Sequence, residues 1–456
     1  MTTPAAASAT PAPLPTGPRG SLLLGNLPDF RSDMTGFLER TARQHGDVVP
    51  LRFANMRFVL LNRPDAIEEV LVKQTKNFVK NVTEPVWWAL LGNGLLLSDG
   101  EFWIRQRRMM QPAFHRARIA EYGRLMVAFT QRRLATWRDG EVRDIHDDMM
   151  GLTLEVVAKT LFDTDVAEQA PAVGRALETV LAEFSRQILQ PLPLPLSVPT
   201  PGNRRFRRAV AELDAIIYDI IERRRAQPAP ADAGDLLSVL LQAQDDEGGG
   251  MTDRQLRDEV MTLFLAGHET TAITLSWAWY LLATNPVVAA NLDEELSTAL
   301  GGEVPTVEDL RRLPYTAKVI RETLRLYPPV WTLEGRRAVR DCTIAGHRIR
   351  AGTVMLVSPW VTHRDARFYA DPERFEPDRW TDQFTKHLPR YAFFPFGGGQ
   401  RLCIGQSFAE MEAALILATI GQRFRLALAD NRAIAPAPSV TLRPSGGVRM
   451  RVNRRS

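Results

Sequence analysis

One cysteine of this 456-residue chain stands in a glycine-rich turn. Residues 396–405 read FGGGQRLCIG, and an apolar stretch of helical length follows from about Gln406 to Ile420. The N–H groups and the positive end of a helix lower the pKa of a nearby cysteine and favour the thiolate, which is the form that ligates metal. We therefore expect a lowered pKa for the Cys403 thiol and a metal-binding sulfur. The alternative for a lone cysteine is a buried, inert residue beside a turn.

A second group of residues suited to chemistry lies at positions 266–271, which read AGHETT. Thr270 follows Ala266 by four residues, so in a helix its hydroxyl can bond the Ala266 carbonyl and open the helix locally. Gly267 removes a side chain at the same turn. These residues predict a notch beside a hydroxyl and the Glu269 carboxyl. The alternative for a Gly-Thr pair in a helix is a kink without function.

The spacing Phe-x-x-Gly-x-Arg-x-Cys-x-Gly, at Phe396, Gly399, Arg401, Cys403 and Gly405, resembles the haem-thiolate signature of the cytochrome P450 family. Three further segments resemble motifs of that family and occur in its order, so the chain is identified as a member over about residues 50–440. They are Trp103-x-x-x-Arg107 (propionate-binding helix), residues 266–271 (oxygen-binding helix) and residues 322–325, ETLR (Glu-x-x-Arg helix).

The resemblance implies haem b (iron protoporphyrin IX) as cofactor, with the Cys403 thiolate as axial ligand of the iron. Haem carries two carboxylates, for which guanidinium groups are suitable partners. For any single arginine of this arginine-rich chain, the alternative is a solvated surface charge. The residues that the resemblance places at the cofactor are Trp103, Arg107, Arg336 (by the spacing Arg-x-Ala-x-x-Asp), Phe396, Arg401 and Gly405.

The same resemblance implies dioxygen chemistry. A thiolate ligand favours cleavage of the O–O bond, and this cleavage requires protons. Dioxygen is expected at the notch formed by Ala266 and Gly267, with Glu269 and Thr270 as a proton relay. Because both relay residues are present, the sequence favours a monooxygenase that uses dioxygen over a peroxygenase or decarboxylase that uses peroxide directly, and over a non-catalytic haem-thiolate sensor.

Glu322 and Arg325 lie three residues apart on one predicted helix face, where they can form an ion pair. The resemblance adds a third partner from a Phe-x-Pro-x-Arg segment, which here is residues 375–379 (FEPDR), ending in Arg379. We expect these three residues to form a rigid structural cluster that supports the cysteine loop, not a reaction centre.

Substrate contacts in the family come from the loop after the second helix, from the long helix and from the turn after Glu-x-x-Arg. The corresponding residues here are apolar or aromatic, so we expect a hydrophobic substrate of small to medium size, such as a terpenoid or a fatty acid. The same residues could equally be core. The candidates for the substrate pocket are Trp87, Trp88, Leu95, Phe264, Val330, Trp331 and Leu333.

The electrons are expected to come from NAD(P)H through a separate ferredoxin and ferredoxin reductase. The chain ends about fifty residues after Cys403, which predicts no fused reductase. Basic runs at residues 105–108, 116–118 and 204–208 are mostly solvated helix faces, and the first two are candidate docking sites for an acidic ferredoxin. A nucleic-acid partner is not expected, because a surplus of +4 is too dilute.

The elements that must position these residues are mainly helical, with two small β regions, as in the cytochrome P450 fold. Residues 48–53 and 57–61 predict a hairpin, and residues 343–344, 347–349 and 353–357 predict further strands that can pair with it in one mixed sheet. The longest helix is predicted from a capping box at Thr252 and Gln255 to about Ala283. Haem is expected between this helix and the cysteine loop.

Composition limits the classes of protein further. The chain is 45% apolar and 24% charged, which excludes a disordered protein, and its two cysteines exclude a disulfide scaffold. Residues 1–20 predict a flexible tail without a signal peptide, and residues 21–456 a single domain. The sequence contains no uncharged apolar run of membrane-spanning length, so we expect a cytoplasmic monomer with no membrane anchor, acting in secondary metabolism.

Overall fold

The computed structural model describes residues 11–81, 85–163, 170–188, 194–226, 235–243, 249–333 and 335–455. The chain forms two compact units. The first, here called the sheet unit, comprises Met1–Val82, Thr332–Pro372 and His387–Leu402. The second, the helical unit, comprises Thr83–Trp331, Glu373–Lys386 and Cys403–Ser456. The expected single domain over residues 21–456 remains a prediction, and each unit is described by itself below.

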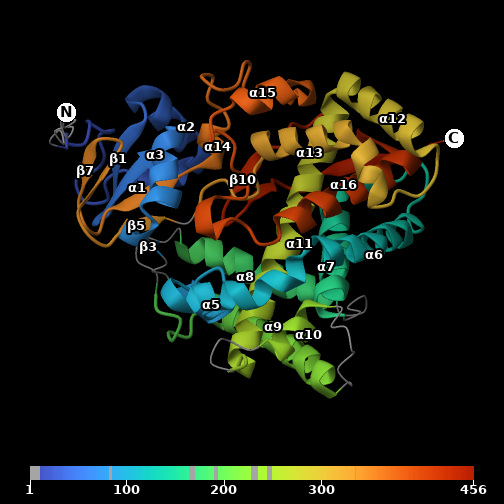
Figure 1. The fold of residues 1–456 in the computed structure, drawn as a ribbon, viewed down its shortest axis with the longest axis horizontal. Coiled ribbons are helices and arrows are strands. Elements are labelled where there is room, and N and C mark those ends of the chain that lie inside the picture. The colour runs from blue at the N-terminus through green and yellow to red at the C-terminus, as the bar shows by residue number, and fades with distance from the viewer. Residues whose placement is uncertain are drawn as a thin grey trace, which may run out of the picture. The chain divides into compact units, whose positions relative to one another are not determined.

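The sheet unit is built on a five-stranded mixed sheet in the order β1-β2-β8-β5-β3 (Figure 1). β2 pairs with β8 in parallel, and the other neighbours are antiparallel. The predicted hairpin and its pairing with the strand predicted at residues 353–357 are therefore confirmed. The strands predicted at residues 343–344 and 347–349 do not join this sheet but pair with each other in a separate two-stranded sheet. The strands are β1 Val48–Phe53, β2 Met56–Leu61, β3 Phe78–Lys80, β5 Arg336–Ala338 and β8 Val354–Val357, beside the hairpin β6 Cys342–Ile344 and β7 His347–Ile349.

Short helices and one ordered N-terminal segment complete the sheet unit. Ala12, which falls in the expected flexible tail, donates its N–H to the Gly346 carbonyl and accepts from Arg348, both at 2.9 Å. Residues 1–10 of that tail lie outside the described residues. One of these helices begins at Pro64, where a proline is tolerated, and continues as a π-helical turn. The helices are α1 Leu27–Ser32, α2 Met34–His45, α3 Pro64–Glu68, η1 Glu69–Lys73, η2 Thr75–Asn77, α14 Pro359–Thr362 and η6 Gly399–Arg401.

The helical unit holds the longer helices and two small sheets. The helices are α4 Pro85–Leu91, α5 Gly100–Met110, η3 Gln111–Phe114, α6 Arg116–Leu134, α7 Ile145–Phe162, α8 Ala170–Ile188, α9 Pro201–Ala226, α10 Leu236–Gln242, α11 Asp253–Thr284, α12 Pro286–Leu300, η4 Glu308–Arg312, α13 Pro314–Leu326, η5 Pro377–Arg379, α15 Asp382–His387 and α16 Gln406–Arg423. The strands are β4 Val142–Asp144, β9 Phe424–Leu428 and β12 Arg449–Arg454 in one sheet, and β10 Pro436–Pro438 and β11 Leu442–Pro444 in the other.

Helix α11 runs through the middle of the helical unit and contacts α7, α9, α13 and α16 (Figure 1). Its start is fixed by the predicted capping box, in which the Thr252 N–H donates to Gln255 Oε1 at 2.8 Å and the Gln255 N–H donates to Thr252 Oγ1 at 3.3 Å. Its end is fixed by Asn285 and by Pro286, which opens α12. The helix spans 32 residues, as predicted, and most of them are buried.

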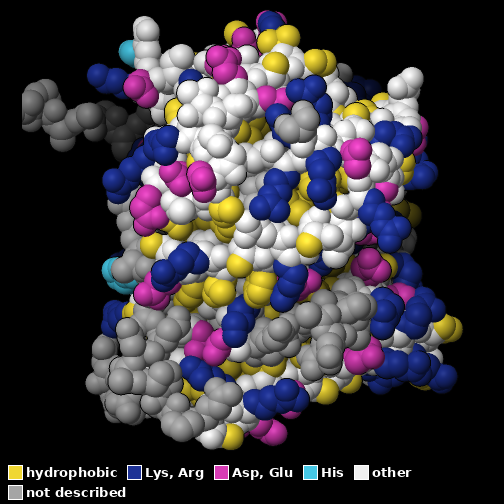
Figure 2. Space-filling view, turned by 90° about the vertical axis from the view of Figure 1, so that its right-hand side faces the viewer, with side chains coloured by type: hydrophobic (Ala, Val, Ile, Leu, Met, Phe, Trp, Pro, Cys, Tyr) yellow, Lys and Arg dark blue, Asp and Glu magenta, His cyan; other side chains and the backbone are white. Residues whose placement is uncertain are grey.

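Two observations bear on membranes and on charge. Within the part of the chain that the structure describes, no helix is both long and apolar enough to cross a bilayer. Figure 2 shows Lys and Arg side chains spread over one face of the protein, with acidic and apolar side chains between them. The arginines of the run at residues 204–208 are exposed on α9, as expected for a solvated helix face.

Candidate functional site

Cys403 lies just before α16, whose N-cap residue is Gly405, and its side chain is exposed. The N–H of Gly405 and the charge of Arg107 lower the pKa of the thiol, but the loss of solvent around the sulfur is the larger effect and raises it. The expectation of a lowered pKa is therefore wrong for the protein alone. Iron binding would supply the missing stabilisation, because a coordinating thiol is deprotonated outright.

Helix α5 brings two of the predicted cofactor residues to the neighbourhood of Cys403. Asp99 accepts a hydrogen bond from the Gly100 N–H and caps the helix. Trp103 is buried, and Arg107, whose Nε donates to Gln111 Oε1 at 3.1 Å, is close enough for its charge to act on the thiol. Burial also lowers the pKa of Arg107 itself. An arginine this close to an exposed thiol suits a ligand that carries both iron and an acid group.

The Ala266–Thr270 turn is the one stretch in the middle of α11 that contains small residues that are not buried. Ala266 is exposed and Thr270 is half-buried, whereas Leu265, His268 and Glu269 are buried. The Thr270 hydroxyl donates to the Ala266 carbonyl at 2.7 Å, as predicted. The expected local opening of the helix is wrong, because α11 continues through this turn as regular α-helix. Ala266 and Thr270 therefore form one open face of the helix, a single turn in length.

Gly267 has a different role from the one expected. A Cβ atom at this position would lie 3.0 Å from Cγ2 of Val157 on α7, so the glycine permits close packing of α7 on α11. On the same side of α11, Thr153 Oγ1 donates to the His268 carbonyl at 2.8 Å. The open face at the position of the predicted notch is thus formed by Ala266 and Thr270. Gly267 instead allows α7 to pack closely on α11.

Glu269 is held by strand β11. Its Oε1 accepts hydrogen bonds from Thr441 Oγ1 and from Arg443 Nε, both at 2.7 Å, and the residue is almost fully buried. Neither partner was identified from the sequence, because 172 and 174 residues separate them from Glu269 and no local pattern links them. The acid of the predicted relay is an ion-paired residue in this structure.

The three residues of the expected ion-pair cluster meet in the interior of the helical unit. Arg325 donates to both oxygens of Glu322, at 2.8 and 2.9 Å, and Arg379 Nε donates to Oε1 at 2.9 Å. Sequence reasoning missed the fourth member, Trp380, whose Nε1 donates to Glu322 Oε2 at 2.8 Å. Arg325 also donates to the Arg374 carbonyl, so the cluster ties α13 to the segment that follows residue 373.

Phe396 and Arg401 belong to the sheet unit, in the glycine-rich turn. Gly399 has φ +66°, and a Cβ atom on it would lie 2.0 Å from the Leu71 carbonyl oxygen. A Cβ atom on Gly398 would lie 2.2 Å from the Tyr391 ring, whose hydroxyl accepts from the Gly399 N–H at 3.1 Å. Two of the three glycines are thus required by close approaches within the protein itself.

Arg336 and Leu333 also lie in the sheet unit. Arg336 is half-buried on β5, opposite Lys80 on β3 and Met355 on β8. The N–H of Leu333, which is half-buried as well, donates to the Val357 carbonyl at 2.9 Å. The sheet therefore fixes the backbone of both residues.

Two candidates for the substrate pocket are core residues in the structure. Phe264 is on the opposite side of α11 from Ala266 and packs against Phe162, with ring centroids 6.1 Å apart. Trp331 is buried and donates its Nε1 to the Ser439 carbonyl at 2.9 Å. For these two, burial supports the alternative of a packing role. Trp87 and Val330 are half-buried, and Leu95 is buried in the loop after α4.

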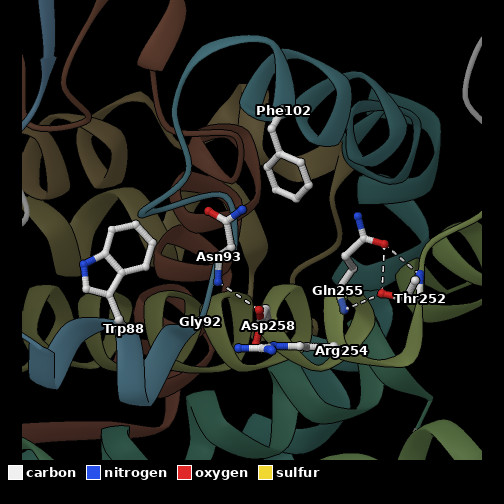
Figure 3. A pocket seen from close by; sticks show the side chains of 8 residues that line it. All are labelled: Trp88, Gly92, Asn93, Phe102, Thr252, Arg254, Gln255 and Asp258. Atoms are coloured by element: carbon white, nitrogen blue, oxygen red, sulfur yellow. Dashed lines mark hydrogen bonds between the residues drawn. The ribbon is translucent and has the colours of Figure 1, made fainter.

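Trp88 is exposed and lines a cavity of about 340 Å³ (Figure 3). The cavity lies between α4, α5 and the first turns of α11, and polar groups of α11 form one of its sides. Its lining residues are Trp88, Gly92, Asn93, Phe102, Thr252, Arg254, Gln255 and Asp258.

The donor set in the helical unit fits a haem-thiolate site. Cys403 offers an unpaired thiol sulfur, which is the ligand that such a site requires. Arg107 supplies a cation near that sulfur for an acid group, and Ala266 leaves one turn of α11 without a bulky side chain. Cys403 would therefore hold the iron, and Arg107 and Trp103 would hold the edge of the cofactor that carries its carboxylates.

Comparisons with known proteins identify the family. A family model described as Cytochrome P450 matches residues 15–449. The chain is 40% identical to cyclooctatin synthase of Streptomyces melanosporofaciens, with 89% of this chain and 88% of the relative covered. It is 39% identical to cyclooctat-9-en-7-ol 5-monooxygenase of the same organism (96% and 94% covered) and 36% identical to pentalenene oxygenase of Streptomyces avermitilis (90% and 91%).

A solved structure described as retinoic acid bound cyanobacterial CYP120A1 is similar to this chain over 97% of its length and 99% of that chain, with a TM-score of 0.87 and 27% sequence identity.

Proposed function

Because the chain belongs to the cytochrome P450 family and is a monooxygenase of that family, we propose that it hydroxylates or epoxidises an apolar terpenoid, with haem bound through Cys403. The helix-rich fold with small sheets is that of the family. The observation that carries the substrate class is the similarity, over about nine-tenths of the chain, to oxygenases named for cyclooctat-9-en-7-ol and pentalenene. The first name describes an alkene with one hydroxyl group and the second a hydrocarbon.

When bound, haem with a thiolate ligand activates dioxygen for insertion of one oxygen atom into a C–H or C=C bond. The contribution of the protein is to hold the cofactor, exclude water and move protons. In this proposal Cys403 holds the iron, and Arg107 with Trp103 holds the carboxylate edge. For Arg336, Phe396 and Arg401 a role at the cofactor is proposed from the family motifs alone. The Glu322, Arg325 and Arg379 cluster has a structural role.

Thr270 is the proposed proton donor of the relay. Its single O–H is engaged with the Ala266 carbonyl in the structure, so its oxygen is left as an acceptor on the open face of α11. Delivering a proton toward that face requires the hydroxyl to rotate away from Ala266, at a cost of about 1 kcal/mol for a neutral hydrogen bond. Thr270 therefore alternates between accepting a proton and donating one.

Glu269 is the proposed source of these protons. Its carboxylate is tied to β11 by Thr441 and Arg443, so passing a proton to Thr270 requires that this tie loosen or that water bridge the two residues. An intact acid and alcohol pair supports a monooxygenase that uses dioxygen. The alternatives, direct use of peroxide or a non-catalytic sensor, need no such pair.

Electrons are proposed to come from a separate ferredoxin and its NAD(P)H-dependent reductase. Arg105 and Arg108 are exposed on α5, the helix whose Arg107 acts on Cys403, so an acidic protein docked there would approach the thiolate side. The side chains of the second basic run, residues 116–118, lie outside the described residues. We also propose that the protein is a cytoplasmic monomer without a membrane anchor.

The test combines spectroscopy with turnover. The reduced protein with carbon monoxide should give the long-wavelength Soret band of thiolate-ligated haem, and Cys403→Ala should lose it. Titration with pentalenene should shift the Soret band of the oxidised protein, and turnover with a surrogate ferredoxin system should yield a product with one added oxygen. A shift with fatty acids only would contradict the terpenoid assignment.

Thr270→Ala tests the relay. We expect this variant to keep the carbon monoxide band and to consume NADPH, while the fraction of electrons recovered in product falls toward about one-hundredth, the low end of what positioned proton transfer contributes. Thr274→Ala is the matched control, because Thr274 lies one turn further along α11 and donates in the same way to the Thr270 carbonyl. Equal coupling in Thr270→Ala and the wild type would contradict the relay.

A further inference from the structure

The loop between α4 and α5 is fastened to α11 by two neighbouring acidic residues. The Asn93 N–H donates to Asp258 Oδ2 at 2.8 Å, and the Leu95 N–H donates to Glu259 Oε2 at 2.9 Å. Figure 3 shows the first of these bonds at the floor of the cavity. Two side chains from adjacent positions of one helix thus hold alternate N–H groups of the loop.

Glycines on either side of Asn93 allow this contact. A Cβ atom on Gly94 would lie 2.3 Å from Thr262 Oγ1 and 2.6 Å from the Asp258 carbonyl oxygen. A Cβ atom on Gly92, which has φ +53°, would lie 2.1 Å from the Asp258 carboxylate. The backbone of residues 92–95 therefore lies directly on the surface of α11, at a distance that other residues could not reach without displacing it.

The two carboxyl groups have different surroundings. Asp258 also accepts from Arg257 Nη1 at 3.0 Å, and Arg257 in turn contacts Asp214. Glu259 is almost fully buried, and within the described residues its Oε1 has no hydrogen-bond partner. Burial, with the neighbouring Asp258 charge, raises the pKa of Glu259 to about 8, so near neutral pH its carboxyl is mostly protonated and still accepts from Leu95.

The position of this contact along α11 connects it to the proposed reaction site. Glu259 precedes Ala266 by seven residues, which is two helical turns and about 10 Å. Leu95 is the residue of the loop that the sequence predicts in the substrate pocket, and its own N–H is the group that Glu259 holds. Whatever fixes the loop on α11 also fixes the place of the Leu95 side chain.

We propose that Asp258 and Glu259 form a latch that positions residues 92–95 on α11 and thereby sets the shape of the substrate pocket at Leu95. The residues of the latch are positioning residues and do not touch substrate. The role of Leu95 rests on the proposed function, whereas the latch itself is a property of the protein without substrate.

The first experiment measures amide hydrogen exchange of Asn93 and Leu95 in the substrate-free holoenzyme. Glu259→Leu removes the acceptor, and Glu259→Gln keeps a neutral acceptor as the matched control. We expect exchange at Leu95 to be about fivefold faster or more in Glu259→Leu, as for the loss of one neutral hydrogen bond, and close to wild type in Glu259→Gln. Gly94→Ala, which alters no carboxyl group, should also raise exchange at both amides. Unchanged exchange in Glu259→Leu and Gly94→Ala would overturn the latch.

The second experiment separates positioning from general destabilisation. Imidazole and 4-phenylimidazole both bind haem iron through a nitrogen, but only the second needs space in the substrate pocket. We expect Glu259→Leu and Gly94→Ala to change the Kd of 4-phenylimidazole about fivefold or more while that of imidazole stays constant, and Glu259→Gln to restore the wild-type ratio. Equal changes for both ligands, or none, would overturn the positioning role. Failure of pentalenene to bind the wild type would contradict only the proposed substrate class.

Discussion

Two glutamates of the helical unit are fully buried, yet their surroundings differ completely. Glu322 on α13 accepts hydrogen bonds from Arg325, Arg379 and Trp380 and from the Glu376 N–H. Glu412 on α16 has no hydrogen-bond partner of normal geometry among the described residues, although the Thr271 hydroxyl lies near enough to lower its pKa. Burial outweighs that effect and raises the pKa of Glu412 to about 8.

The comparison shows that burial alone does not decide what a carboxyl group does in this protein. Where cations and N–H donors surround it, as at Glu322, the group is a permanent structural tie. Where they are missing, as at Glu412, the group keeps its proton and remains able to titrate close to neutral pH. Glu269, held by one arginine and one threonine, lies between these two cases.

The largest expected effect comes from removing the charge of Glu322. In Glu322→Gln two buried guanidinium groups lose their carboxylate, which should lower the free energy of unfolding by about 3–5 kcal/mol and reduce haem retention. Urea unfolding and the haem content of the purified protein measure the effect. Glu376→Gln, which removes a half-exposed partner of Arg379, is the control and should cost less than about 1 kcal/mol. Similar losses in both variants would contradict the assigned role of Glu322.

The second prediction concerns Glu412 and pH. The unfolded chain releases this proton near the ordinary pKa of 4.5, whereas the folded chain holds it to about 8. Between these values rising pH favours the unfolded state, by up to about 1.4 kcal/mol per pH unit, so the stability that this group contributes below pH 4.5 is lost as pH approaches 8. Glu412→Gln should therefore flatten the decline of urea stability between pH 6.5 and 8.

Between pH 6.5 and 8 the pH dependence of stability reports on the buried carboxyl groups and not on the buried histidines. His146 and His268, whose pKa values burial lowers to about 4, cost stability only as pH falls below their ordinary value of 6.5. Glu259 contributes a slope of the same sign as Glu412. The double variant Glu259→Gln/Glu412→Gln should therefore be flatter than either single variant, and an unchanged slope in all three would contradict the buried protonated state.

The third prediction concerns the ion pair of Glu269 with Arg443. Arg443→Leu removes the only cation that the structure pairs with Glu269 among the described residues, so the free energy of unfolding near neutral pH should fall by about 1–3 kcal/mol. Proton delivery should also change, which is measured as the ratio of product to NADPH consumed. Arg449→Leu on β12 is a matched control, because Arg449 is exposed. Wild-type coupling and wild-type stability in Arg443→Leu would contradict the role of Arg443 in holding Glu269.

The smallest effect is expected from Thr441→Val, which keeps the volume of the side chain and removes one hydrogen bond to Glu269. The loss should be about 1 kcal/mol, with the Arg443 ion pair intact. Urea unfolding near pH 7 measures it. A loss as large as that of Arg443→Leu would mean that the threonine and not the arginine holds the carboxylate.

Local signals in the sequence predicted much of the fold. The capping box at Thr252 and the pair Asn285 and Pro286 fix both ends of α11, because each acts on backbone groups within one turn. The hydroxyl bond of Thr270 was predictable for the same reason, since it needs only helical spacing. The pairing of β2 with β8 required one further assumption, that the two apolar β regions share a sheet.

The errors have a common physical cause, which is that they depend on what packs against a residue. Helical periodicity does not say that Gly267 faces Val157, or that Phe264 packs against Phe162. The pKa of Cys403 depends on the solvent lost around the sulfur, and this loss is set by the tertiary structure. Arg443 and Trp380 were missed because their partners are distant in the sequence.

Helix α11 makes a series of contacts with different parts of the protein. The direction in which each of these residues points around the helix axis is set by the capped first turn. Asp258 and Glu259 hold the loop, Ala266 and Thr270 form the open face, Glu269 reaches β11, and Trp277 donates to the Leu442 carbonyl. Deleting a single residue between Glu259 and Ala266 would rotate the residues that hold the loop by about 100° around the helix axis relative to the open face. Between these contacts, the segment from Asp258 to Trp277 should therefore tolerate substitutions better than a change of length.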